Sequence, residues 1–165
     1  MAASRNPTRI TTEPGKQELF ITREFEAPRE VVFRAFTDPE IYAQWIGPRG
    51  FTTTMDVFEA VNGGRWRWIQ TDPDGNVFAF RGVYHEVVAP ERIIGTFEFE
   101  GWPRSGHVVL EVSGFEDLPS GRSRVTTQSI YRSVEDRDRM VNEGMESGTR
   151  EGYERLDEWI ESRRR

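Results

Sequence analysis

Few side chains in this 165-residue sequence are of the types that supply a nucleophile or hold a metal. The sequence has no cysteine, which excludes disulfides, thiol nucleophiles and Cys-ligated metals. Its two histidines are His85 and His107, and His85-Glu86 lacks the second histidine of an HExxH zinc motif. Ser147 lies in a predicted helix, outside any Gly-x-Ser-x-Gly elbow. We therefore predict no metal site, no cofactor and no serine nucleophile.

Two residues on one predicted strand are candidates for acid–base catalysis. If the strand over residues 77–88 is regular, Glu86 shares a face with Phe80 and Tyr84. A carboxylate beside aromatic side chains has a raised pKa and can act as a general acid or base. Glu86 and Tyr84 are the catalytic candidates on this basis; alternatively, Glu86 lies in solvent at the strand end or pairs with a neighbouring arginine.

Two further glutamates, Glu98 and Glu111, lie on predicted strands. Either can face inward or outward, because a shift of one residue reverses the face. The sequence leaves both directions open.

Composition limits the classes of partner. The formal net charge of −6 argues against a nucleic-acid partner, since that affinity depends on neutralising phosphates. No apolar run approaches the length of a membrane span, and the N-terminus has no apolar segment typical of a secretory signal. We expect a cytoplasmic protein that contacts neither nucleic acid nor membrane.

The order of predicted elements indicates an α+β fold. Helices are expected at 28–37, 40–46 and about 134–162, and strands at 18–26, 51–60, 65–71, 77–88, 92–100, 107–115 and 123–133. Six consecutive strands on short connections should form an antiparallel meander. The resulting sheet of about seven strands should curve around the long C-terminal helix, whose apolar stripe can cover it. We expect residues 1–15 to be a flexible tail and 16–165 to be a single domain.

The C-terminal helix carries Gly144, Gly148 and Gly152 at a spacing of four. Glycine in a helix interior costs about 1 kcal/mol relative to alanine, so three on one side need a reason. One reason is close approach of the helix to a neighbouring backbone. The other is that the missing side chains leave a hollow between the helix and the sheet.

A set of motifs along the chain resembles a known family. The run TREFEAPREVVFRAFTDPEIYAQWIGPRGF contains Ala27-Pro28, a TDPE segment at 37–40, Trp45 and Gly47-Pro48. It is followed by Gly63-Gly64 ahead of Trp66, and by Gly82, Glu86 and the run Pro90-Glu91-Arg92-Ile93. These features are similar to the family named after the activator of the heat-shock-protein-90 ATPase, within the START-like and polyketide-cyclase-like (SRPBCC) superfamily. The resemblance spans residues 18–160.

The resemblance implies a helix-grip fold with an apolar pocket between the curved sheet and the C-terminal helix. It implies binding of a small hydrophobic ligand, aromatic or lipid-like, with Trp45 near the mouth. The ligand-binding residues expected on this basis are Trp45, Trp66, Trp68, Phe80, Tyr84, Phe97, Met145, Gly148, Thr149 and Gly152.

Two departures from the family pattern affect these expectations. In many members a tryptophan follows the glycine that corresponds to Gly148, whereas Thr149 follows it here, which should enlarge the cavity. The eukaryotic co-chaperones of the family carry an additional chaperone-binding domain, for which this sequence has no room. We therefore do not expect chaperone activation.

Two other functions remain open on the same fold. One is an enzyme of the cyclase, dehydratase or hydrolase type, which needs at least two titratable groups converging in the pocket. The other is a chaperone-associated protein-interaction module, which needs an exposed apolar patch. The sequence also leaves open whether the protein forms a homodimer.

Overall fold

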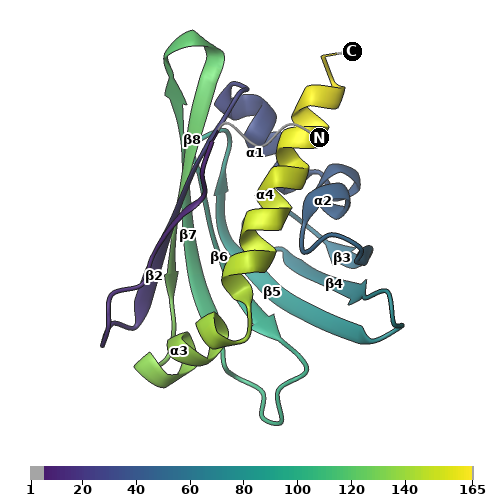
Figure 1. Ribbon diagram of the computed structural model, residues 1–165, viewed down its shortest axis with the longest axis vertical. Coiled ribbons are helices and arrows are strands. Elements are labelled where there is room, and N and C mark those ends of the chain that lie inside the picture. The colour runs from purple at the N-terminus through teal and green to yellow at the C-terminus, as the bar shows by residue number, and fades with distance from the viewer. Residues whose placement is uncertain (1–5, 165) are drawn as a thin grey trace.

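The computed structural model describes residues 6–164 as one curved antiparallel sheet with helices on its concave side (Figure 1). The strands are β1 (Arg9–Thr11), β2 (Glu18–Phe25), β3 (Thr52–Phe58), β4 (Arg65–Thr71), β5 (Val77–Val88), β6 (Arg92–Phe99), β7 (Val109–Leu118) and β8 (Arg122–Ile130). Their order in the sheet is β1-β2-β8-β7-β6-β5-β4-β3. The six strands from β3 to β8 form the predicted meander, and β2 pairs with the last of them.

Two short helices follow β2 and two helices follow β8. These are α1 (Arg29–Thr37), α2 (Pro39–Trp45), α3 (Val134–Asn142) and α4 (Met145–Ser162), and a 3-10 turn over Pro119–Gly121 joins β7 to β8. The Asp38 carboxylate accepts hydrogen bonds from the backbone N–H groups of Glu40 and Ile41, which caps α2 directly after α1. Helix α4 lies across the concave face of the sheet (Figure 1). The α+β helix-grip fold predicted from the sequence is therefore confirmed.

The prediction of one continuous helix over residues 134–162 is wrong. Gly144 adopts a left-handed conformation with φ of 88°, and it separates α3 from α4. Glycine takes this conformation without steric cost. Gly144 is thus the break between two helices, and the glycines that face inward from α4 are Gly148 and Gly152.

The segment expected to be a flexible tail is ordered over the part that the structure describes. Residues 9–11 form β1, which pairs with β2 and was not predicted. Thr8 is buried, and its hydroxyl accepts a hydrogen bond from Arg23 Nε at 3.3 Å. Residues 1–5 of the predicted tail lie outside the described residues.

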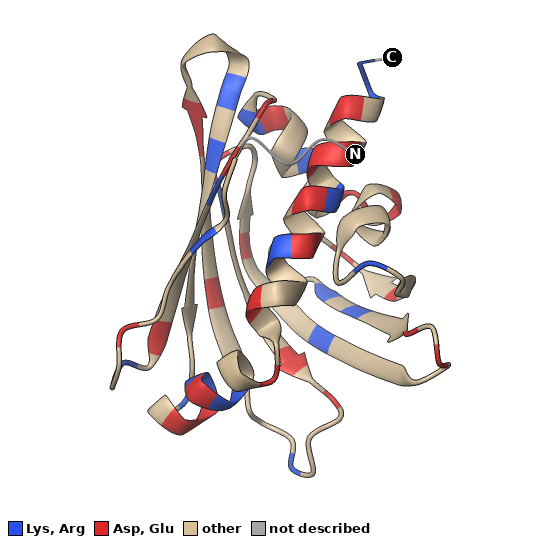
Figure 2. Ribbon diagram, viewed as in Figure 1, with Lys and Arg blue, Asp and Glu red and all other residues tan. Residues whose placement is uncertain are grey.

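Helix α4 is attached to the rest of the fold by both packing and charge. Leu156 and Ile160 are buried in the main core, together with Leu19 and Phe25 of β2. The buried guanidinium of Arg23 pairs with Asp157 of α4. Figure 2 shows residues of both charge signs along α4. None of the described helices is both long and apolar enough to cross a bilayer.

Candidate functional site

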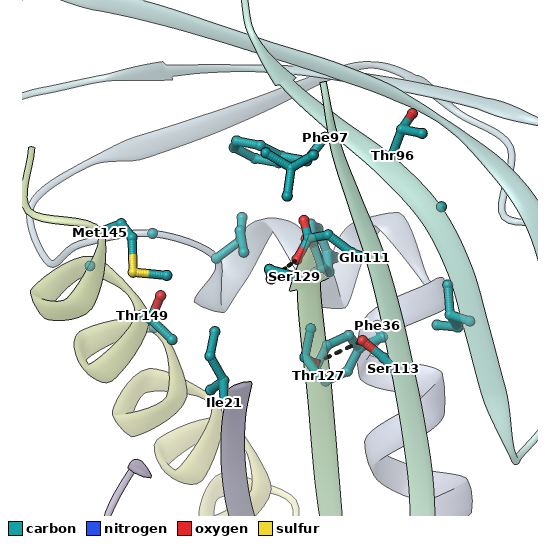
Figure 3. Close-up of a pocket in the computed structure, with 18 of the residues that line it drawn as sticks. Ile21, Phe36, Thr96, Phe97, Glu111, Ser113, Thr127, Ser129, Met145 and Thr149 are labelled. Carbon is teal, nitrogen blue, oxygen red and sulfur yellow. Dashed lines mark hydrogen bonds between the residues drawn. The ribbon is translucent and has the colours of Figure 1, made fainter. Parts of the chain in front are cut away.

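A cavity of about 250 Å³ lies between the concave face of the sheet and α4. It occupies the place that the helix-grip resemblance assigns to a pocket, and Figure 3 shows side chains from the sheet and from α4 facing each other across it. Most of the lining is apolar or aromatic: Ile21, Phe36, Tyr42, Trp45, Ile46, Trp66, Trp68, Tyr84, Ile93, Phe97, Val109, Tyr131, Met140, Met145 and Tyr153.

One wall of the cavity is aromatic and comes from β4, β5 and β6. Trp66 and Trp68 alternate with Arg65 and Arg67 along β4, so both indoles point inward. Their rings are stacked, with centroids 4.0 Å apart and planes 19° apart. Phe97 of β6 follows at 5.8 Å from Trp66.

Two of the predicted aromatic residues lie differently from expectation. Phe80 does not line the cavity, because it packs beyond the wall, against Trp68 on one side and Phe99 on the other. Trp45 does line the cavity, but it is 2% exposed and does not form an open mouth. Its Nε1 donates a hydrogen bond to the Ala35 carbonyl at 3.0 Å, which ties α2 to α1.

Helix α4 supplies the opposite wall. Met145, Gly148, Thr149 and Gly152 all line the cavity, as expected. The glycines also serve close packing: a Cβ on Gly152 would lie 3.3 Å from the Trp45 carbonyl oxygen, and one on Gly148 would lie 3.7 Å from Pro48 Cγ. Both explanations of the glycine spacing therefore apply to α4, since α4 approaches the α2–β3 connection closely and remains hollow beside it.

A polar patch on β7 and β8 forms part of the sheet wall. None of its residues was predicted from the sequence to bind a ligand. Glu111 pairs with Ser129 across the two strands, and Ser113 pairs with Thr127. All four residues line the cavity. Ser129 Oγ donates a hydrogen bond to Glu111 Oε2 at 3.3 Å, and the hydroxyls of Ser113 and Thr127 lie 2.8 Å apart (Figure 3).

The sequence carried a weak signal for this patch. One face of β8 and of the residue after it carries Val125, Thr127, Ser129 and Tyr131. The apolar residues at both ends of this series indicate an inward face with polar residues in its middle. Along β7 the signal is ambiguous, because the opposite face carries Leu110 and is also partly apolar. The direction of Glu111 therefore follows only from its pairing with Ser129.

The cavity alters the protonation of its acidic groups. Burial raises the pKa of Glu111 to about 7, and the hydrogen bond from Ser129 lowers it only in part. Burial also raises the pKa values of Tyr42, Tyr84, Tyr131 and Tyr153, which line the same cavity. The Glu111 charge adds to this effect for Tyr42, Tyr131 and Tyr153. These phenols stay neutral near pH 7, whereas Glu111 titrates there.

Glu86 does not face the cavity, contrary to the expectation from a regular strand. Tyr84 pairs with Gly95 and Glu86 with Ile94, so β5 carries one extra residue, a β-bulge, between these pairs. After the bulge Val87 packs against the core, and Glu86 accepts a hydrogen bond from Arg92 Nε at 2.7 Å. Of the two catalytic candidates, only Tyr84 reaches the cavity.

The other side chains that could take part in chemistry lie outside the cavity lining. Glu98 lies outside the cavity lining and pairs with Arg81 Nε at 3.0 Å. His85 is exposed, and His107 Nδ1 lies 3.0 Å from the Asp136 carboxylate. Ser147 Oγ donates to the Gly144 carbonyl at 3.0 Å, at the start of α4. Within residues 6–164, no group of three or more His, Cys, Asp or Glu side chains could hold a metal ion.

Comparisons with known proteins agree with the fold. A family model described as "Activator of Hsp90 ATPase homolog 1-like protein" matches residues 26–161. A crystal structure from Rhodobacter sphaeroides is 26% identical, covers 93% of this chain and 99% of its own, and superposes with a TM-score of 0.82. A solution structure from Arthrobacter aurescens is 26% identical, with coverages of 90% and 88% and a TM-score of 0.82. The comparison with curated proteins gave no match.

A crystal structure of protein Ms6760 from Mycobacterium smegmatis has the same fold. It is 23% identical, covers 94% of this chain and 99% of its own, and has a TM-score of 0.84.

Proposed function

This chain belongs to the family of Activator of Hsp90 ATPase homolog 1-like proteins, and on that premise we propose that it binds a small, largely hydrophobic ligand in the cavity between its sheet and α4. The observation that carries the proposal is a cavity of about 250 Å³ whose lining is mainly aromatic and aliphatic. Transfer of apolar ligand surface from water into such a site contributes roughly 25 cal/mol per Å². The polar patch on β7 and β8 would orient the ligand.

The size of the cavity narrows the class of ligand. Drug-sized ligands occupy pockets of about 300–1,000 Å³, and an apolar cavity of about 150 Å³ holds one benzene molecule. The present volume of about 250 Å³ lies between these cases. It favours a single ring with a short chain, or two small rings, over a long lipid.

The proposal is tested by filling the cavity from α4. Thr149 lines the cavity and points from α4 toward the sheet (Figure 3). Thr149→Trp introduces a large ring into the cavity. It should abolish the binding of phenylbutanol, a neutral probe of suitable size, in isothermal titration calorimetry. The control is Glu161→Trp, which adds the same ring at an exposed position of the same helix.

Two results would contradict the proposal. One is the absence of binding heat for phenylbutanol with the wild-type protein. The other is unchanged affinity in Thr149→Trp with circular dichroism showing a native fold. Native mass spectrometry of the freshly purified protein would identify the natural ligand if it copurifies.

An enzymatic function remains a second candidate, and the observation that favours it concerns Glu111. A carboxyl group with a pKa of about 7 is suited to general acid–base catalysis at neutral pH, and four tyrosines line the same cavity. If Glu111 moves protons to or from carbon, a copurified ligand should gain deuterium when the wild-type protein is incubated in D₂O. Glu111→Gln should stop the exchange, and absence of exchange in the wild-type protein would count against this function.

The third function, a chaperone-associated interaction module, has less support. It requires an exposed apolar patch, whereas five aromatic residues of β4 to β6 line the cavity or pack into a core cluster: Trp66, Trp68, Phe80, Tyr84 and Phe97. Stoichiometric recovery of this protein with a chaperone in a pull-down would favour the interaction module over ligand binding.

A further inference from the structure

Glu111 is the one carboxyl group among the described residues that line the cavity. Glu111 projects from the inner face of β7, and Figure 3 shows its carboxyl group directed into the space bounded by Phe97, Met145 and Thr149. The ladder between β7 and β8 determines this direction, because Glu111 lies opposite Ser129. The carboxyl group is therefore held in place by the sheet and faces the position that a ligand would occupy.

The hydrogen bonds of this carboxyl group are incomplete. In the part of the chain that the structure describes, its hydrogen-bond donor is Ser129 Oγ, at 3.3 Å from Oε2. The nearby hydroxyls of Ser113 and Thr127 are paired with each other at 2.8 Å. A carboxylate can accept about four hydrogen bonds, so Glu111 has capacity for more donors on the cavity side.

The charge of this carboxylate is also uncompensated within the cavity. No lysine, arginine or histidine occurs among the described residues that line it. An ionised carboxylate in an apolar environment is costly unless a cation or several donors accompany it. A ligand that brings a cation to this position would remove that cost, and a ligand with its own carboxylate would increase it.

We propose that the ligand bound by this cavity is a small aromatic or aliphatic amine whose protonated nitrogen pairs with Glu111 while its apolar body lies against Trp66, Trp68 and Phe97. This inference rests on the proposed function and adds the chemical class of the ligand. An ammonium group supplies three hydrogen-bond donors and one positive charge. These match the Glu111 carboxylate, which can only accept hydrogen bonds and receives one, at 3.3 Å, from Ser129.

The test uses three probes that share one apolar body and differ at the polar end: phenylbutylamine, phenylbutanol and phenylbutanoate. Calorimetry at about pH 8, above the pKa of about 7 of Glu111, should give the amine an affinity about tenfold or more above that of the alcohol. The butanoate should bind most weakly. Glu111→Gln should reduce the preference for the amine to about threefold or less.

The matched control is Glu98→Gln. Glu98 lies on the neighbouring strand β6, but it pairs with Arg81 and does not line the cavity. Glu98→Gln should leave the preference for the amine unchanged. This result would show that the preference depends on the carboxylate in the cavity and not on the net charge of the protein.

The outcomes distinguish this inference from the function on which it rests. If the alcohol binds but the amine gains no preference, or if the preference survives Glu111→Gln, the amine proposal is wrong and hydrophobic binding stands. If the butanoate binds most tightly, the proposal is also wrong. If no probe binds to the wild-type protein, the proposed function itself fails, and the amine proposal with it.

A pH series provides a second readout. The other ionisable groups among the described residues that line the cavity are Tyr42 of α2, Tyr84 of β5, Tyr131 after β8 and Tyr153 of α4. The pKa of each is raised, so they stay neutral. An alkylamine resembles a lysine side chain and stays protonated below about pH 10. Affinity for the amine should therefore rise as pH increases through about 7, and this dependence should be absent in Glu111→Gln.

Discussion

At the scale of single residues, Glu111 imposes a cost on the folded protein that depends on pH. Burial raises its pKa to about 7 in the folded protein, compared with an ordinary value of about 4.5 for a glutamate in water. Between these two values the folded state holds a proton that the unfolded state has released. Stability from this group is therefore fully present below about pH 4.5 and is lost as pH rises through about 7.

Glu111→Gln should make the protein more stable than the wild type at about pH 8, by about 1–3 kcal/mol, because the amide cannot ionise. The difference should shrink as pH falls toward about 4.5. Urea unfolding of both proteins across this range measures it. A difference that stays constant with pH would show that Glu111 is not the titrating group.

The same scale shows which of the residues expected at the site the fold brings to the cavity. Nine of the ten expected ligand-binding residues line the cavity, because strand alternation and helical spacing determine their faces. Phe80 has the correct face, but it lies too far along β5. Glu86 was misplaced because a bulge shifts the alternation, and Glu111 was left undecided because its face depends on a partner strand.

At the scale of elements, the two inward glycines of α4 should respond differently to substitution. A Cβ on Gly148 would make an ordinary contact with Pro48 at 3.7 Å, so Gly148→Ala should stabilise the helix by up to about 1 kcal/mol. A Cβ on Gly152 already lies 3.3 Å from the Trp45 carbonyl oxygen, so the branched side chain of Gly152→Val should destabilise the protein by about 1–3 kcal/mol.

Thermal unfolding of the two variants beside the wild type measures this contrast. Equal effects of the two substitutions would mean that α4 does not approach the α2–β3 connection as closely as described. The sequence indicated that these glycines share a face, but only the contact with Trp45 and Pro48 distinguishes them. The helix break at Gly144 was missed because a left-handed residue leaves the apolar spacing on both sides intact.

At the scale of the whole molecule, the N-terminal strands complete the sheet, because β2 pairs with β8, the last strand of the meander. The meander from β3 to β8 was predictable because short turns separate its strands. Pairing of β2 with β8 brings Glu18 opposite Ile130. The three-residue strand β1 then pairs with the other edge of β2. Such a short strand has little hydrophobic periodicity, which is why the sequence suggested a flexible tail there.

Deletion of residues 1–12 should therefore destabilise the fold without altering the cavity. The deletion removes β1 and takes Thr8 away from the buried Arg23, which should cost about 1–3 kcal/mol. The first lining residue is Ile21, so affinity for phenylbutanol should stay within about threefold of the wild type. Urea unfolding and calorimetry measure the two effects. Unchanged stability would contradict a structural role for β1.

The stacked indoles of Trp66 and Trp68 give the protein an optical property of its own. Two aromatic chromophores at van der Waals separation couple electronically, and their shared absorption should appear in the circular dichroism spectrum as paired bands of opposite sign. Trp66→Phe should remove those bands. Since both rings line the cavity, a molecule that enters it alters the spectrum directly, and occupancy can be followed without a label.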